Sequence, residues 1–187
     1  GDPARRLGND LAFGQLAENN LETLQQNKVK KIVSICPHCV RTIGTDWKEF
    51  GEAPPVEHHS EFLARHLDKL PAQTATGESI VYHDPCYLGR YRGVYDEPRA
   101  VAALAGEVID PPRARNRSRC CGAGGGHAFL GEEKGKRVNV DRAEERLATG
   151  AGIERAAVPL RPTVSLVWLA RVSACPPTCL DLGPPPP

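Results

Sequence analysis

The chain has 187 residues, enough for one domain or for two small repeats that share a core. Its formal net charge is only +1, which excludes the broad positive field that nucleic acid binding requires. Hydrophobic residues (40%) and charged residues (25%) occur at the levels of an ordinary globular protein, and no apolar run is long enough to predict a membrane span.

The first segment predicts a helix followed by a strand that ends at a thiol. Residues 8–27 carry leucines at roughly helical spacing among polar residues and predict an amphipathic helix. Residues 29–35 are dense in valine and isoleucine and predict a buried strand that runs directly into Cys36. Because open α/β sheets bind ligands at the carboxyl ends of their strands, Cys36 and Cys39 lie where a site is expected.

Strand and helix signals alternate through the rest of the chain. The predicted helices are at 39–50, 60–70, 97–105 and 129–149, and the predicted strands are at 56–59, 79–83 and 107–109. Ser60 and Glu61 are candidate caps for the helix at 60–70. The polar stretch 72–78 is the expected boundary between two halves. The last 30 or so residues, rich in proline, are expected to have little regular structure.

This alternation predicts an α/β fold. We expect two similar halves of short parallel strands with flanking helices, cysteines at the strand ends and an irregular C-terminal tail. The chain contains no Met and begins with Gly1, without the apolar core of a signal peptide. We interpret these features as those of a fragment of a longer protein from a reducing compartment.

Five of the seven cysteines lie in three contexts that suggest a metal site. Cys36 and Cys39 form a Cys-x-x-Cys turn, Cys86 ends the sequence His-Asp-Pro-Cys, and Cys120 and Cys121 precede a run of glycines. Soft thiolates bind iron–sulfur clusters and zinc. The residues alone leave open structural zinc, thiol–disulfide exchange at the Cys-x-x-Cys turn, and a surface loop with incidental cysteines at the adjacent pair.

The order of these motifs resembles the cysteine-rich (CCG) domain family. The matching stretches are VYHDPCYLGR at 81–90 and CCGAGGG at 120–126, and the likeness covers residues 1 to about 151. The family includes one of the subunits of heterodisulfide reductase, the iron–sulfur subunits of glycolate oxidase and of anaerobic glycerol-3-phosphate dehydrogenase, and lactate-utilisation proteins. Its motif is a cysteine, then a Cys-Cys pair, then a Cys-x-x-Cys pair.

The family carries this motif twice, so the resemblance implies the end of one copy and the beginning of another. Residues 1–71 would be the end of the first cysteine-rich repeat, and residues 72–151 an incomplete second repeat. The implied iron–sulfur ligands are Cys36, Cys39, Cys86, Cys120 and Cys121. The first two would close the first copy, and the other three would open the second.

The second copy lacks its closing pair. Aligning residues 29–36 with residues 151–158 places Val158 and Arg161 where two cysteines belong. Codons for Val-Pro-Leu, read in the next frame, can encode Cys-Pro-Phe, so we hypothesise that a frameshift replaced the native end with a divergent tail at 152–187. On this hypothesis Cys175 and Cys179 are incidental.

The resemblance implies an oxidoreductase subunit that transfers electrons through cysteine-ligated 4Fe–4S clusters, including the non-cubane type of heterodisulfide reductase. The implied partners are an upstream ferredoxin-type domain or subunit and a flavoprotein or other redox partner. The implied location is the cytoplasm, or the cytoplasmic face of a membrane through partners. The alternatives are a structural zinc-binding module and a truncated product that holds no cluster.

Several other residues have a functional and a structural reading. His83 could donate a hydrogen bond to a thiolate or cluster sulfur, or be a structural histidine that caps the end of a strand. His38 could likewise be a donor near the site, or simply be exposed. His58 and His59 resemble a metal pair, but as neighbours on a strand they would face opposite sides, so we leave both out of the site.

The glycine run lacks the Lys-Ser/Thr ending of a phosphate-binding loop, and we expect its backbone N–H groups to approach cluster sulfurs instead. The basic stretch 113–119 predicts a solvated loop or a docking edge.

Overall fold

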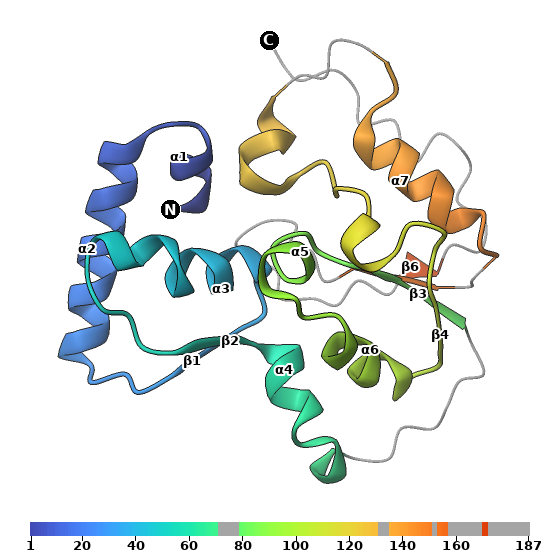
Figure 1. Cartoon of the computed structure of the whole chain (residues 1–187), viewed down its shortest axis with the longest axis horizontal. Helices are drawn as coiled ribbons and strands as arrows, with labels where there is room; N and C mark the ends of the chain where they lie inside the picture. The colour runs from blue at the N-terminus through green and yellow to red at the C-terminus, as the bar shows by residue number, and fades with distance from the viewer. Residues whose placement is uncertain (71–78, 131–134, 151–152, 157–169, 172–187) are drawn as a thin grey trace.

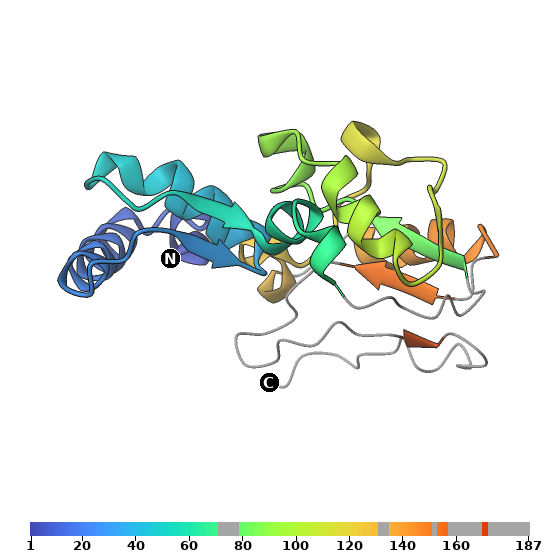
Figure 2. The same ribbon diagram turned by 90° about the horizontal axis from the view of Figure 1, so that it is seen from below.

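The computed structural model describes residues 1–70, 79–130, 135–150, 153–156 and 170–171. Within these ranges the chain forms two small sheets with helices around them, and the two halves lie side by side in Figures 1 and 2. The first half contains α1 (Asp2–Arg6), α2 (Asp10–Gln26), β1 (Ile32–Ser34), α3 (Pro37–Gly44), η1 (Asp46–Glu49), β2 (Val56–His58), α4 (His59–Ala64) and η2 (Leu67–Lys69). The second half contains β3 (Ser79–His83), α5 (Gly89–Arg92), α6 (Asp96–Ala103), β4 (Glu107–Ile109), η3 (Arg115–Arg117), η4 (Gly124–Phe129), α7 (Val138–Leu147), β5 (Ile153–Ala156) and β6 (Ala170–Arg171).

The first half is built on α2 and a two-stranded parallel sheet. β1 pairs with β2 in the register Ile32 to Val56. The buried face of α2 packs against the η1 turn, and the cluster of buried residues comprises Phe13, Ala17, Leu21 and Trp47. Each large side chain buried in such a cluster contributes roughly 1.5–3 kcal/mol by removal from water. This core fixes α2 and η1, and α3 contacts both η1 and the two strands of the sheet.

The second half is built on a four-stranded sheet in the order β4-β3-β5-β6. β3 lies in the middle and is parallel to both β4 and β5. Its residues Ile80, Val81 and Tyr82 are buried, as is usual where both faces of a parallel sheet are covered, and the strand delivers its carboxyl end to the loop that carries Cys86.

Helices α4 and α1 join the first half to the second. α4 packs on α6, and α1 lies beside η4, the gold turn next to the N-terminus in Figure 1. The N-terminal segment therefore contacts the glycine run across the junction, and this contact brings the two groups of cysteines toward each other.

The predicted fold class is confirmed: the structure is α/β, with short parallel strands in two small sheets. The strands predicted at 79–83 and 107–109 are observed with those bounds, and the predicted helix at 8–27 is α2. β6 is the exception to the parallel order, since it runs antiparallel to β5.

Three predicted elements of the first half need correction. β1 is shorter than predicted and is not buried, because Val33 is 46% exposed and β2 is its only strand partner among the described residues. The helix predicted at 39–50 begins at Pro37, which suits the first helical position, and breaks after Gly44 into η1. The cap of α4 is His58, with Glu61 completing a capping box, and Ser60 is not the cap.

In the second half, α7 begins at Val138 instead of residue 129. The sequence before it forms η4, and Gly135 has a φ of 78°, a left-handed conformation that a helix does not continue through. The short elements α1, α5, η3, β5 and β6 were not predicted. The expected boundary at 72–78 and the sites of Val158, Arg161, Cys175 and Cys179 lie outside the described residues.

Candidate metal centre

The first thiol pair lies where β1 gives way to α3. Cys36 is the N-cap of α3; its sulfur accepts the backbone N–H of Cys39 at 3.4 Å, and its own N–H donates to Ser34 Oγ at 3.1 Å. A hydrogen bond from the Cys39 thiol lowers the pKa of Cys36 to about 6 despite its burial, and the same contact raises the pKa of Cys39. At neutral pH the pair therefore holds a thiolate at Cys36 and a thiol at Cys39.

Two histidines hold the backbone that leads into Cys36. His58 is fully buried; its Nε2–H donates to the Ile35 carbonyl at 3.2 Å, and its Nδ1 accepts from Ser60 Oγ at 2.6 Å. His59 hydrogen-bonds to the backbone of Ser34, and the two imidazole centroids are 4.2 Å apart. Burial lowers the pKa of both, that of His58 to about 4, so both are neutral at neutral pH.

The expectation that these two histidines face opposite sides is wrong. His59 is the first residue of α4 and not a strand residue, so its ring lies beside that of His58. Both rings hydrogen-bond to backbone groups just before Cys36, so they hold this part of the chain in place. Apart from the pair itself, no sequence signal points to this role, because the two carbonyls they contact belong to a different segment of the chain.

The second thiol group comprises Cys86, Cys120 and Cys121. A hydrogen bond from Cys120 lowers the pKa of Cys86 to about 6, although the burial of Cys86 opposes this. The contact of Cys121 with Cys120, together with the burial of Cys121, raises the pKa of Cys121. The N–H of Gly122 donates to Cys120 Sγ and that of Ala123 to Cys121 Sγ, each at 3.4 Å. Backbone N–H groups of the segment after the pair thus point at its sulfurs.

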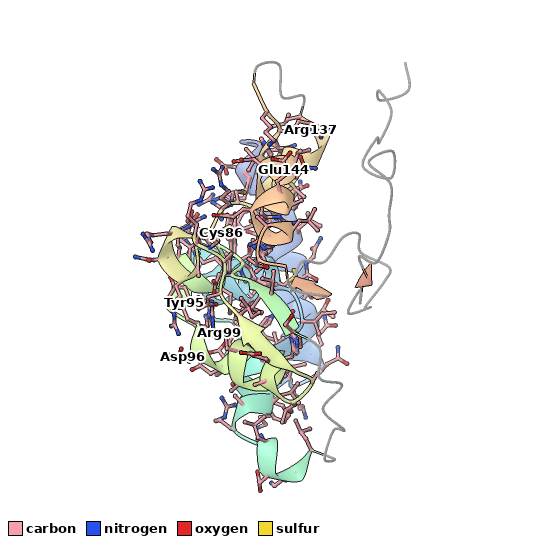
Figure 3. All side chains as sticks on the ribbon, turned by 90° about the vertical axis from the view of Figure 1, so that its right-hand side faces the viewer. Cys86, Tyr95, Asp96, Arg99, Arg137 and Glu144 are labelled. Carbon is pink, nitrogen blue, oxygen red and sulfur yellow. The ribbon has the colours of Figure 1, made fainter. Side chains whose placement is uncertain are left out.

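Buried polar contacts fix the loop that carries Cys86. Asp84 is 2% exposed and accepts two hydrogen bonds from Arg99, at 2.7 and 2.8 Å, and one from the Arg115 N–H at 2.7 Å. Ser118 Oγ donates to the Asp84 carbonyl at 2.9 Å. Asp84 therefore ties the Cys86 loop to the segment just before Cys120, and Figure 3 shows Arg99 with its neighbours Tyr95 and Asp96 below Cys86.

His83 has a structural role. It is 1% exposed, and its Nδ1 lies 2.6 Å from a guanidinium nitrogen of Arg146, which is itself 2% exposed. Because the guanidinium can only donate, Nδ1 is the acceptor and the ring is neutral; burial, with the nearby arginines, lowers its pKa well below the usual value. His83 thus joins β3 to α7, in agreement with the structural reading.

His38 lies between the two thiol groups. Its Nδ1 is 2.7 Å from Asp2 Oδ2, and its ring stacks on Tyr87 with centroids 3.8 Å apart. Burial opposes protonation of His38, but the hydrogen bond to Asp2, the charge of Asp2 and the charge of Cys36 together raise its pKa. Asp2 is buried, and its pKa is lowered by His38 and Arg6 although burial alone would raise it.

The glycine run is needed for close packing. A Cβ at Gly124 would lie 2.5 Å from Cε1 of His38, and one at Gly126 would lie 3.1 Å from a methyl of Leu7 in the segment after α1. Gly126 also has a φ of 85°, which side-chain-bearing residues rarely adopt. The bare backbone thus lets the segment after Cys121 contact both the N-terminal segment and His38.

The basic stretch 113–119 is largely neutralised within the chain. Three of its arginines pair with carboxylates: Arg113 with Glu145, Arg115 with Asp96, and Arg119 with Asp141. These ion pairs fasten the loop to α6 and α7, so its charge is mostly used internally.

All five predicted cysteine ligands are free thiols. The structure brings Cys36 close to Cys39, and Cys86 close to Cys120 with Cys121 alongside. Within the described part of the chain, however, no three His, Cys, Asp or Glu side chains converge closely enough to hold a metal ion. Among the same residues, no helix combines the length and apolarity needed to cross a bilayer.

The chain matches the cysteine-rich domain family over residues 1–44 and 80–153. It is 42% identical over 163 residues to "Probable iron-sulfur-binding oxidoreductase FadF" of Bacillus subtilis, covering 85% of this chain and 23% of that protein. It is 40% identical to "EtfAB:quinone oxidoreductase" of Syntrophomonas wolfei over 79% of this chain and 22% of that protein. It is 36% identical to one of the subunits of the dihydromethanophenazine:CoB–CoM heterodisulfide reductase of Methanosarcina mazei, over 78% of this chain and 37% of that protein.

The chain thus spans less than two fifths of the length of each of these relatives. No solved structure matches it significantly.

Proposed function

This chain belongs to the cysteine-rich domain family, and from that premise we propose that it is an electron-transfer module whose cysteines hold an iron–sulfur centre. The observation that carries the proposal is the pairing of thiols within two groups, Cys36 with Cys39 and Cys86 with Cys120. Each group contains one cysteine, Cys36 or Cys86, whose pKa is lowered to about 6. Thiolate, not thiol, is the form that binds metal, so each group offers a ligand at neutral pH.

The donor chemistry fits an iron–sulfur centre. Soft sulfur ligands and nearby backbone N–H groups, such as those of Gly122 and Ala123, are the features that hold such centres and adjust their potentials. The described thiols lie in two groups and do not form one closed site. Binding would therefore draw the thiols of a group closer together, or recruit ligands beyond the described residues.

The proposed ligands are Cys36 and Cys39 in the first group, and Cys86, Cys120 and Cys121 in the second. When bound, a 4Fe–4S cluster, including the non-cubane type, would supply one-electron storage. The surrounding residues hold the thiol-bearing loops in place: His58 and His59 do so before Cys36, and Asp84 does so before Cys86.

The remaining parts of the proposal concern the whole protein. The names of the relatives, which are oxidoreductases and a reductase subunit, support a place in a redox complex. As the other members of that complex we propose an upstream ferredoxin-type domain or subunit and a flavoprotein or other redox partner. We place this activity in the cytoplasm or at the cytoplasmic face of a membrane, where the partners would hold the module.

The test is chemical analysis of the chain purified without oxygen, for iron, zinc and acid-labile sulfide. The expected result is iron with an equal amount of sulfide, together with broad visible absorption that bleaches on addition of dithionite. Zinc alone, in a colourless protein, would replace the proposal with a structural zinc module. Absence of all three after reconstitution with iron and sulfide would overturn it.

A further inference from the structure

Arg90 bridges the two segments that carry the second thiol group. It lies in α5, four residues after Cys86, and its Nη1 donates to the Ser118 carbonyl at 2.7 Å and more weakly to the Asn116 carbonyl at 3.5 Å. Ser118 is two residues before Cys120. The charge of Arg90 also contributes to the lowered pKa of Cys86. The guanidinium of a residue on the Cys86 side of the group thus holds the segment on the Cys120 side.

The charge of Arg90 is used differently from that of its neighbours. Arg99 pairs with Asp84 and Asp110, and Arg92, two residues away on the same helix, pairs with Glu61. Among the described residues Arg90 has no carboxylate partner, and its hydrogen bonds go to backbone carbonyls. Its positive charge is therefore available to the thiol group.

We propose that Arg90 is a positioning residue that holds Cys86 and Cys120 together and supplies positive charge to any centre these thiolates bind. The positioning part rests on contacts within the chain alone, and the charge part rests on the proposed function. The planar guanidinium can span two carbonyls at once, which a lysine ammonium on a flexible stem cannot do in a fixed geometry.

The charge has a defined consequence for electron transfer. Adding an electron makes a thiolate-ligated centre more negative, so a nearby positive charge stabilises the reduced form more than the oxidised form. Removal of the charge is expected to make the reduction potential more negative. Solvent weakens this effect, because Arg90 is exposed, but does not change its sign.

The positioning part is tested on the full chain without metal. Dibromobimane links two thiols only when they lie close together, and peptide mass spectrometry identifies the linked pair. We expect a Cys86–Cys120 link in the unaltered chain and in Arg92→Gln, the control that removes a charge from the same helix. Arg90→Gln should reduce the yield several-fold, and Arg90→Lys should give an intermediate yield. Equal yields in all four chains would overturn the positioning role.

The charge part is tested on the iron- and sulfide-loaded chains by redox titration followed through their visible absorption. Arg90→Gln should shift the potential to more negative values, whereas Arg90→Lys, which keeps the charge, and Arg92→Gln should stay near the unaltered chain. A potential in Arg90→Gln equal to that of Arg92→Gln would overturn the charge role. If the unaltered chain takes up no iron, the charge part fails together with the proposed function, and the cross-linking result still decides the positioning part.

Discussion

His58 shows at the scale of one residue how a histidine can serve a thiol site without touching it. Its two ring nitrogens are occupied by Ile35 and Ser60, so it holds the backbone before Cys36 and is not available as a ligand. The sequence could not predict this role, because the carbonyl it contacts lies 23 positions away along the chain. What the sequence shows at this scale is that five cysteines lie in three short, contiguous motifs; their role as ligands stays a prediction.

The buried neutral state of His58 predicts a loss of stability in acid. An unfolded histidine titrates at about 6.5, whereas the pKa of folded His58 is lowered to about 4. As the pH falls the unfolded chain binds the proton first, so the stabilisation is complete above about pH 6.5. It is lost between about pH 6.5 and 4, by up to about 3 kcal/mol. Urea unfolding of the chain across this pH range measures the loss.

His58→Asn should be less stable at pH 7 and should show a shallower dependence on pH over this range. Part of the dependence should remain, because His59 and His83 also have lowered pKa values and act in the same direction. His66→Asn is the control, since the ring of His66 hydrogen-bonds within its own helical turn, to the Phe62 carbonyl, and lies tilted against the Phe62 ring. A slope in His58→Asn identical to that of the unaltered chain would contradict this account.

Gly124 packs closely against the ring of His38, which predicts that a side chain at position 124 is destabilising. A Cβ at position 124 would lie 2.5 and 2.6 Å from two atoms of the His38 ring, so Gly124→Ala should displace the imidazole from Asp2 and Tyr87. We expect a loss of about 1–3 kcal/mol in the free energy of unfolding. In a chain that already carries His38→Ala, the added methyl has room and should cost much less. Urea unfolding of the four chains gives the coupling, and additive losses would refute the contact.

At the scale of elements, central β3 was easier to predict than the short edge elements. β3 has a dense run of β-branched and aromatic residues and a partner on each side, so propensity and environment agree. β1 carries a similar run but is half exposed, because sheet pairing and not local sequence decides burial. Helices α1 and α5 are too short for periodicity to reveal, and they depend on contacts with distant segments.

The docking of α6 against the end of β3 depends on one buried ion pair. Asp84 is 2% exposed, and Arg99 from α6 is its side-chain partner. Arg99→Ala leaves a buried carboxylate without this partner and should lower the free energy of unfolding by about 3–5 kcal/mol. Arg65→Ala is a matched control, because its partner Glu57 also binds Lys31 and the Arg65 side chain is 51% exposed. That change should cost less than about 1 kcal/mol, and equal losses in both variants would contradict the assignment.

At the scale of the whole molecule, the strand that the sequence relates to β1 lies beside β3. The alignment that places residue 29 on 151 places β1 (Ile32–Ser34) inside β5 (Ile153–Ala156). β5 runs parallel to β3, the strand that ends near Cys86. The internal repeat itself stays a prediction. The junction between the halves could not be predicted from sequence. It rests on contacts between α1, which includes Asp2, and the glycine run, and these two segments are far apart along the chain.

This arrangement predicts that the cysteines differ sharply in their effect on metal content. After reconstitution with iron and sulfide, Cys36→Ser with Cys39→Ser should lower the iron per chain, and so should Cys86→Ser with Cys120→Ser. Each pair removes a thiolate whose pKa is lowered to about 6 together with its hydrogen-bonded neighbour. Iron and sulfide analysis measures the loss, and thermal unfolding of the loaded chains should show a lower midpoint wherever iron is lost, since a bound group stabilises the folded state.

The chain supplies its own control in Cys175 and Cys179, which the family motif does not include. Replacing both with serine removes two thiols, as each of the other double variants does. If this variant binds as much iron as the unaltered chain, the iron content depends on where the cysteines lie in the motif and not on the number of thiols. An equal fall in all three double variants would mean that iron binds to thiols without regard to the fold. A fall for only one of the two motif pairs would assign the centre to that thiol group, because each group holds its own thiolate and could load alone.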